Sequence, residues 1–123
     1  MTDPALHHKI TYIEFTTADI ERTKRFYAAV FGWSFQDWGP DYISIENAGI
    51  DGGFRRANSE EIQTDSMGST GPLIVLYSAN LEATEAAILA AGGSITVPTF
   101  PFPGGRRFHF SDAIGNLLAV WSE

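Results

Sequence analysis

Glu14 and Tyr12 are the first side chains along the sequence that could do chemistry together. Residues 10–15 alternate in the manner of a strand, which places these two side chains on one face. A carboxylate that faces a partly apolar cavity could act as a general base, or could bind a cationic or hydroxyl-bearing ligand. The structural alternative is that Glu14 is hydrogen-bonded to Tyr42, to Ser44 or to a partner subunit.

His109 is the second candidate, because it is the only histidine within a predicted strand, residues 106–110. Imidazole titrates near neutral pH and suits acid–base chemistry. The sequence leaves open which face of this strand His109 occupies. If Phe108 and Phe110 correspond to Tyr42 and Ser44 in the repeat, they face the pocket. His109 is then expected to face away, which favours a structural role, although it stays among the candidate ligand contacts.

Residues 97–105 contain three prolines, which cannot donate to the hydrogen-bond ladder of a central strand. We therefore expect a loop in this segment. Phe100 and Phe102 could then form a lid over a pocket, with Arg106 or Arg107 reaching an anionic ligand. Packing at a dimer contact explains the two aromatic residues equally well.

Two copies of one structural unit must position these candidates. Residues 19–23 and 80–84 stand in register, since each segment begins with a helix N-cap, Asp19 or Asn80, and continues at helical spacing. Each helix stops at a glycine, and a strand and a hairpin follow it. Each half of the chain is therefore predicted to run β-α-β-β-β.

The repeat predicts an α+β fold in which two tandem βαβββ modules form a curved mixed sheet around a cup-shaped pocket. We expect a single domain, with module one at residues 8–55, a linker at 56–72 and module two at 73–123. The linker is rich in Ser, Thr, Gly and acidic residues and has no sustained period.

Composition excludes several classes of partner. The 123 residues carry a formal net charge of −7 and only two short basic pairs, so no nucleic-acid partner is expected. The chain has no cysteine, which excludes disulfides and thiolate chemistry. No apolar stretch approaches the roughly 20 residues of a membrane span. We expect a cytoplasmic protein without a membrane partner, and a homodimer that covers its exposed sheet edges.

The chain resembles the vicinal oxygen chelate superfamily, which contains glyoxalase I, bleomycin-resistance proteins, extradiol dioxygenases and fosfomycin-resistance proteins. The resemblance rests on residues 10–15, 19–27, 31–33 and 108–121. The Phe-Gly-Trp at 31–33, together with a terminal Ala-Val-Trp, resembles a poorly characterised glyoxalase-like bacterial branch. The resemblance implies the two-module fold, a small-molecule ligand and a homodimer.

In metal-using members, the resemblance implies four ligands, one on the first strand and one on the last strand of each module. Unless the register on the last strands is shifted by two, these positions are occupied here by Tyr12, Leu73, Gly53 and Ala119. Three of these side chains cannot coordinate an ion, so we expect neither a metal nor another cofactor. An atypical divalent-metal site at Glu14 and Glu46 is the alternative.

We therefore expect a small-molecule-binding protein that acts by capture or sensing, as the resemblance to bleomycin-resistance proteins implies. The candidate ligand contacts are Tyr12, Glu14, Tyr42, Ser44, Tyr77, Phe100, Phe102, Arg107, His109 and Trp121. The alternative is a glyoxalase-like lyase or isomerase, in which Glu14 is the catalytic base beside a carbonyl. A third hypothesis is a protein that only assembles as a dimer.

Overall fold

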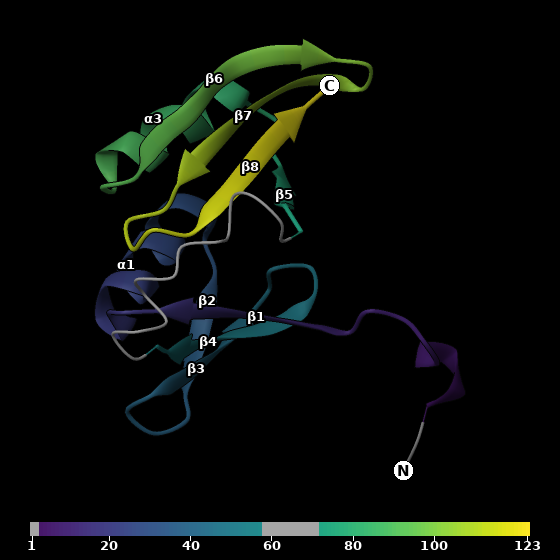
Figure 1. Cartoon of the computed structure of the whole chain (residues 1–123), viewed down its shortest axis with the longest axis vertical. Coiled ribbons are helices and arrows are strands. Elements are labelled where there is room, and N and C mark those ends of the chain that lie inside the picture. The colour runs from purple at the N-terminus through teal and green to yellow at the C-terminus, as the bar shows by residue number, and fades with distance from the viewer. Residues whose placement is uncertain (1–2, 58–71) are drawn as a thin grey trace.

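The computed structural model describes residues 3–57 and 72–123. The first half contains a short 3-10 helix, η1 (Pro4–Leu6), and then β1 (Tyr12–Thr17), α1 (Ile20–Phe31), β2 (Ser34–Asp37), β3 (Tyr42–Glu46) and β4 (Asp51–Arg56). The second half contains β5 (Ile74–Tyr77), α3 (Leu81–Ala90), β6 (Ser94–Phe102), β7 (Gly105–Ser111) and β8 (Leu117–Ser122) (Figure 1). The predicted linker begins at Arg56, which ends β4, and its residues 58–71 lie outside the described part of the chain.

The strands form two four-stranded mixed sheets with the same topology, which confirms the predicted α+β fold of two repeated modules. Their strand orders are β1-β4-β3-β2 and β5-β8-β7-β6. In each sheet the first and last strands of the module pair in parallel, and the other pairs are antiparallel. Helices α1 and α3 contact each other on one side of the molecule (Figure 1). No helix within the described ranges is long and apolar enough to span a membrane.

The repeat extends to the hydrogen bonds of the helix caps. Asp19 accepts from the backbone N–H of Arg22, and Asn80, 61 residues later, accepts from that of Ala83. Before each cap, a hydroxyl pair of 2.7 Å joins strand to helix, Thr17 with Thr23 and Ser78 with Thr84. These caps satisfy backbone donors that the first helical turn leaves unpaired. The predicted equivalence of the two helices is confirmed.

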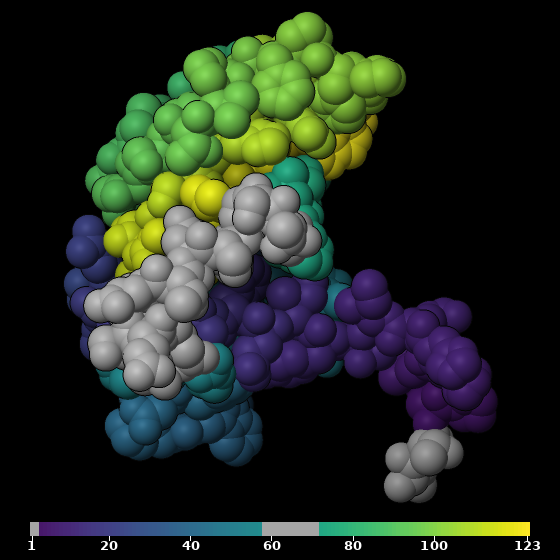
Figure 2. Space-filling view, in the orientation of Figure 1, coloured from purple at the N-terminus to yellow at the C-terminus, as the bar shows by residue number. Residues whose placement is uncertain are grey.

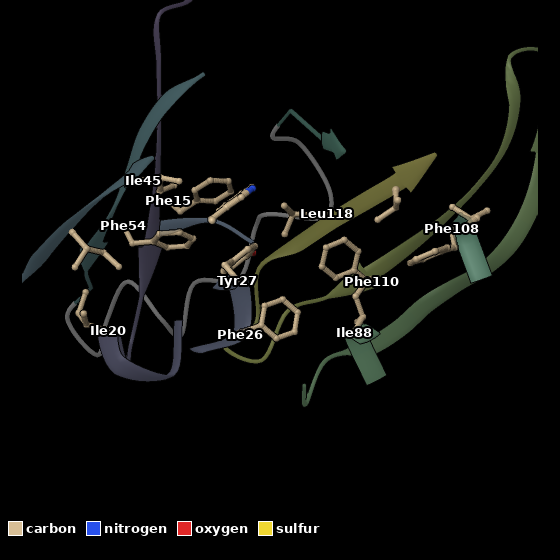
Figure 3. Packing of buried hydrophobic residues seen from close by; sticks show 14 residues of the cluster. Phe15, Ile20, Phe26, Tyr27, Ile45, Phe54, Ile88, Phe108, Phe110 and Leu118 are labelled. Carbon is tan, nitrogen blue, oxygen red and sulfur yellow. The ribbon is translucent and has the colours of Figure 1, made fainter. Parts of the chain in front are cut away.

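One aromatic core joins the two modules. Tyr27 of α1 is fully buried and stacks on Trp33, with 4.7 Å between the ring centroids. Tyr27 also lies 5.2 Å from the ring of Phe54 in the first sheet, and its neighbour Phe26 lies 6.5 Å from Phe110 in the second. Figure 3 shows both α1 side chains between the core residues of the two sheets. Burial of such aromatic groups supplies most of the hydrophobic stabilisation.

A buried polar group also lies between the modules. The carboxylate of Asp112, in the turn after β7, accepts from Tyr27 Oη at 2.6 Å and from the backbone N–H of Asn116 at 2.8 Å. The Asn116 side chain donates to this carboxylate and to the backbone carbonyl of Thr16 on β1. Burial raises the pKa of Asp112, and these hydrogen bonds oppose that rise.

The prediction of a loop at residues 97–105 was wrong. Most of this segment belongs to β6, which pairs with β7 as far as Phe102 opposite Gly105. β6 is the outermost strand of its sheet and makes ladder hydrogen bonds on one side only, so its prolines are tolerated. Register shifts between Ile95 and Phe100 accommodate the irregular segment. Phe100 and Phe102 are therefore strand residues and not residues of a lid loop.

Candidate functional site

Each sheet has one face that its helix covers and one that it leaves uncovered, and we call the second the open face. On β1, Phe15 is buried in the core, so Tyr12 and Glu14 lie on the first open face, as predicted from the alternation. The predicted ligand contacts Tyr12, Glu14, Tyr42 and Ser44 belong to the first open face. The second open face carries Tyr77, Phe100, Phe102, Arg107, His109 and Trp121.

The first open face centres on a carboxylate surrounded by hydroxyl groups. Tyr42 Oη donates to Glu14 Oε1 at 3.0 Å, and the hydroxyls of Tyr12 and Tyr42 are hydrogen-bonded to each other. Arg55 Nε lies 3.6 Å from Glu14 Oε2, in an ion pair whose side chains are both about half exposed. Burial first, and then the hydrogen bonds that Tyr42 makes with Tyr12 and Glu14, raise the pKa of Tyr42 well above its usual range. The structural alternative for Glu14, a hydrogen bond with Tyr42, is thus present.

Gly53 allows the two tyrosine hydroxyls to meet. A Cβ at this position would lie 2.7 Å from Tyr12 Oη and equally close to Tyr42 Cε1, which is too short for real atoms. The backbone of Gly53 pairs regularly with Glu14 and with Ser44, so no bulge is present. The position at which the resemblance placed a metal ligand is therefore covered by two tyrosine side chains.

The second open face holds an arginine between two phenylalanines. The Cζ atom of Arg107 lies 5.2 Å from the ring centroid of Phe100 and 5.4 Å from that of Phe102. Trp121 makes an edge contact with Phe102 and another with Tyr77. A cavity of about 270 Å³ lies here, lined by Val75, Phe102, Gly104, Arg107 and Trp121. Rings and a single guanidinium are typical walls of a small-molecule site.

His109 lies on this open face, so the assumed match of Phe108 with Tyr42, which turned His109 away from the pocket, was wrong. Phe108 and Phe110 are fully buried in the core instead. Ile43 pairs with the core residue Phe54 of β4, and Phe108 pairs with the equivalent core residue of β8, Val120. Phe108 therefore corresponds to Ile43, at an offset of 65 residues, and not to Tyr42, at the assumed offset of 66. A difference of one residue turns every side chain of a strand to the other face. Burial, and then the charge of Arg107, lower the pKa of His109.

Another cavity, larger than the one beside Arg107, lies next to the hydrophobic core. It has a volume of about 510 Å³ and is lined by the core side of the first sheet, including Phe15 and Trp33, and by residues 73–77 around β5. Figure 2 shows the hollow between the β1 region and β5. Asp51 is its only charged lining residue. This crevice is apolar and contains none of the predicted contacts except Tyr77.

The donor set does not fit the superfamily's divalent metal. Within the described part of the chain, no group of three or more His, Asp and Glu side chains could hold an ion. A register shift of two would bring either Asp51 and Leu117 or Arg55 and Trp121 to these positions, which adds one carboxylate at most. Glu46, the suggested partner of Glu14, is exposed at the end of β3 and accepts from Ser34 Oγ at 3.5 Å.

The sequence analysis did not identify two residues of the first open face, Arg55 and Trp38, as part of the site. Arg55 pairs with Glu14, and Trp38 donates from Nε1 to Ser44 Oγ at 3.0 Å. The signal for Arg55 was present, because it lies two residues after Gly53 on one strand and so shares its face. Trp38 follows β2, where alternation no longer applies, and gave no such signal.

Comparisons with known proteins agree with this architecture. A family model described as "Glyoxalase/Bleomycin resistance protein/Dioxygenase superfamily" matches residues 9–120. No curated protein matches the sequence significantly.

Several solved structures share the fold. A glyoxalase/bleomycin resistance protein/dioxygenase family enzyme from Burkholderia phytofirmans PsJN has a TM-score of 0.71 at 16% identity, over 91% of this chain and 96% of that chain. A glyoxalase-related enzyme from Fulvimarina pelagi has 0.71 at 20% identity, over 94% and 88%. The fosfomycin resistance protein FosX from Listeria monocytogenes, in complex with Mn(II) and dihydroxypropylphosphonic acid, has 0.73 at 18% identity, over 93% and 89%. At these identities the likeness establishes the fold alone.

Proposed function

The chain belongs to the glyoxalase/bleomycin resistance/dioxygenase superfamily, and from this premise we propose that its open faces bind a small organic molecule by capture or sensing, without a resident divalent metal. The observation that carries the proposal is the second open face, where Phe102, Trp121 and the guanidinium of Arg107 line a cavity of about 270 Å³. Two further aromatic side chains contact these residues, Phe100 on Arg107 and Tyr77 on Trp121. An apolar site with few polar groups is the usual form of a capture site.

The first open face supports binding without a metal. In FosX the ligand is accompanied by Mn(II). In this chain the positions at which the resemblance implies metal ligands carry Tyr12, Leu73, Gly53 and Ala119, and the two tyrosine hydroxyls at Gly53 bond to each other. Hydroxyl and aliphatic side chains are poor ligands for a divalent ion compared with His, Glu and Asp.

Exposure of both open faces supports a homodimer. Tyr12 is 45% exposed and Tyr77 is 52% exposed, although the Tyr12 hydroxyl contacts that of Tyr42 and the Tyr77 ring contacts Trp121. Among the described residues, the cited hydrogen bonds and ring contacts of each cluster stay within its own module, so a second copy is the simplest cover for these rings. Light scattering at several concentrations tests the assembly, and a monomer throughout would contradict it.

A second candidate function is a glyoxalase-like lyase or isomerase with Glu14 as the base. It is favoured by the position of Glu14 beside Tyr42 Oη and Arg55, since proton abstraction next to a carbonyl needs both a base and an oxyanion stabiliser. The ion pair and the half-exposed position of Glu14 favour binding over catalysis.

The metal content of the protein distinguishes a metal-free capture site from a metal-dependent enzyme site. The untagged protein is measured by elemental mass spectrometry and then titrated with nickel, zinc and manganese. We expect no stoichiometric metal and no tight binding. Tight binding of one ion per chain that is lost in a Glu14→Gln variant would overturn the metal-free site and favour an enzyme.

A further inference from the structure

Two buried side-chain nitrogens on β7 have no hydrogen-bond partner. They are Arg107 Nε and His109 Nε2, and no other buried side-chain nitrogen or oxygen in the described residues lacks a partner. Both side chains lie on the second open face, and two residues along a strand are about 7 Å apart. A buried polar group without a partner costs free energy, so two on one surface indicate a missing binding partner.

Arg107 differs from its neighbour Arg106 in this respect. Arg106 extends to the other side of the sheet, where its two terminal nitrogens lie 2.6 and 3.5 Å from the carboxylate of Glu82. Arg107 makes no ion pair within the described part of the chain. Phe100 and Phe102 hold its guanidinium by cation–π contacts, which leave the hydrogen-bonding edge of the group available.

The remaining contacts define the kind of ligand that fits. Phe102 and Trp121 line the adjoining cavity of about 270 Å³, which suits a compact apolar group. The formal net charge of −7 repels anions from the surface as a whole, so the chain offers anions no general attraction. Recognition of an anion here depends on the local donors of β7.

We propose that the second open face binds a compact ligand bearing an oxyanion, a carboxylate or a phosphate, with Arg107 and His109 as donors and with Phe102 and Trp121 against its apolar part. The inference rests on the proposed small-molecule function and specifies its ligand class. Arg107 supplies a planar fork that matches two oxygens of the anion, and neutral His109 adds a further donor through its Nε2–H.

Benzoate, its neutral analogue benzamide, and inorganic phosphate are suitable probes. Each is titrated into the full-length protein labelled with ¹⁵N, and the signals of Arg107 Nε–H and the Trp121 indole N–H are followed by NMR. Benzoate is expected to shift both signals and to bind at least about tenfold more tightly than benzamide, because a charge-assisted hydrogen bond is lost in the amide. Phosphate is expected to shift the Arg107 signal.

Variants separate the arginine from general effects. Arg107→Gln is expected to weaken benzoate binding at least about tenfold, and the matched control Arg106→Gln is expected to leave it unchanged. Should Arg107→Gln fail to fold, Arg107→Lys keeps the charge without the planar fork and is expected to weaken binding severalfold. Benzoate binding that survives both Arg107 variants would overturn the inference.

The probes also separate this inference from the function on which it rests. Benzamide and benzoate binding equally well at Trp121 would overturn the oxyanion preference and leave small-molecule capture standing. Absence of shifts from every probe would overturn both.

Discussion

Tyr27 on α1 donates a hydrogen bond of 2.6 Å to Asp112 in the turn after β7, and this bond ties the helix of the first module to a hairpin of the second. Both side chains are buried, so the bond is shielded from water. Burial and the nearby carboxylate raise the pKa of Tyr27, which keeps the phenol protonated as the donor. The joint between the modules is therefore a polar contact inside an aromatic core.

Replacing Tyr27 with Phe should lower the free energy of unfolding by about 1.5 to 3 kcal/mol, because a buried carboxylate loses a donor while the ring stays in place. Urea unfolding followed by circular dichroism measures the change. The control is Tyr77→Phe, which removes a hydroxyl that is also bonded to a carboxylate, that of Glu123, but on the exposed surface. Equal losses in the two variants would contradict a special role for the Tyr27–Asp112 contact.

Adjacent glycines on β4 should respond differently to alanine. A Cβ at Gly52 would lie 2.6 Å from the backbone oxygen of Ile13, which cannot move without disturbing β1. A Cβ at Gly53 would meet the ends of two tyrosine side chains, which can turn outward. Gly52→Ala should cost about 1 to 3 kcal/mol and Gly53→Ala about 1 kcal/mol or less.

The same pair of variants tests the tyrosine contact. Gly53→Ala should shift the ring signals of Tyr12 and Tyr42 in NMR spectra, whereas Gly52→Ala should affect mainly β1. A Gly53→Ala variant with unchanged tyrosine signals would show that the rings do not rest on this residue.

Local signals predicted the modules and the first open face well. N-caps, helix stops and the alternation on β1 depend on neighbouring residues only, and they gave the correct repeat and the correct side for Glu14. The partners of that side chain depend on strand pairing: Arg55 reaches Glu14 because β4 returns in parallel beside β1. Nothing local in the sequence specifies that register.

The second hairpin could not be predicted from the repeat alone. β6 is nine residues long where β2 has four, so the offset between the modules changes before β7 begins. The assumed match of β7 with β3 was one residue off, and this single residue reversed the side expected for His109. The prolines of β6 were misleading for a related reason, since their effect depends on whether a strand lies at the edge of a sheet, which only the complete topology determines.

His109 should titrate below the ordinary value for histidine, near 6.5, because burial and the charge of Arg107 both disfavour its protonated form. The unfolded chain then binds more protons than the folded chain just below pH 6.5, so this group lowers stability as the pH falls through that window. Arg107 is the charged group on the same strand face, and Phe100 and Ala119 are its uncharged neighbours on β6 and β8.

The pKa of His109 can be measured from its ring signals by NMR. Arg107→Gln should raise that pKa toward the ordinary value without restoring it fully, because burial, the larger cause, remains. Arg106→Gln should not change it, since that guanidinium is paired with Glu82 on the other side of the sheet. A pKa that does not respond to Arg107→Gln would contradict the assigned cause.

Glu14→Gln distinguishes capture from proton abstraction. The ion pair with Arg55 spans 3.6 Å between half-exposed side chains, so its loss should cost less than about 1 kcal/mol of stability.

If Glu14 were a general base, the wild-type protein would accelerate deuterium exchange at carbons next to a carbonyl, and the variant would lose roughly 10²- to 10⁴-fold of that rate. We expect no exchange above background in small keto acids and keto aldehydes, measured by proton NMR in D₂O. Glu46→Gln is the matched control, because that carboxylate lies on the same sheet beside a turn and bonds to Ser34. Exchange that Glu14→Gln abolishes and Glu46→Gln preserves would establish an enzyme in place of a capture protein.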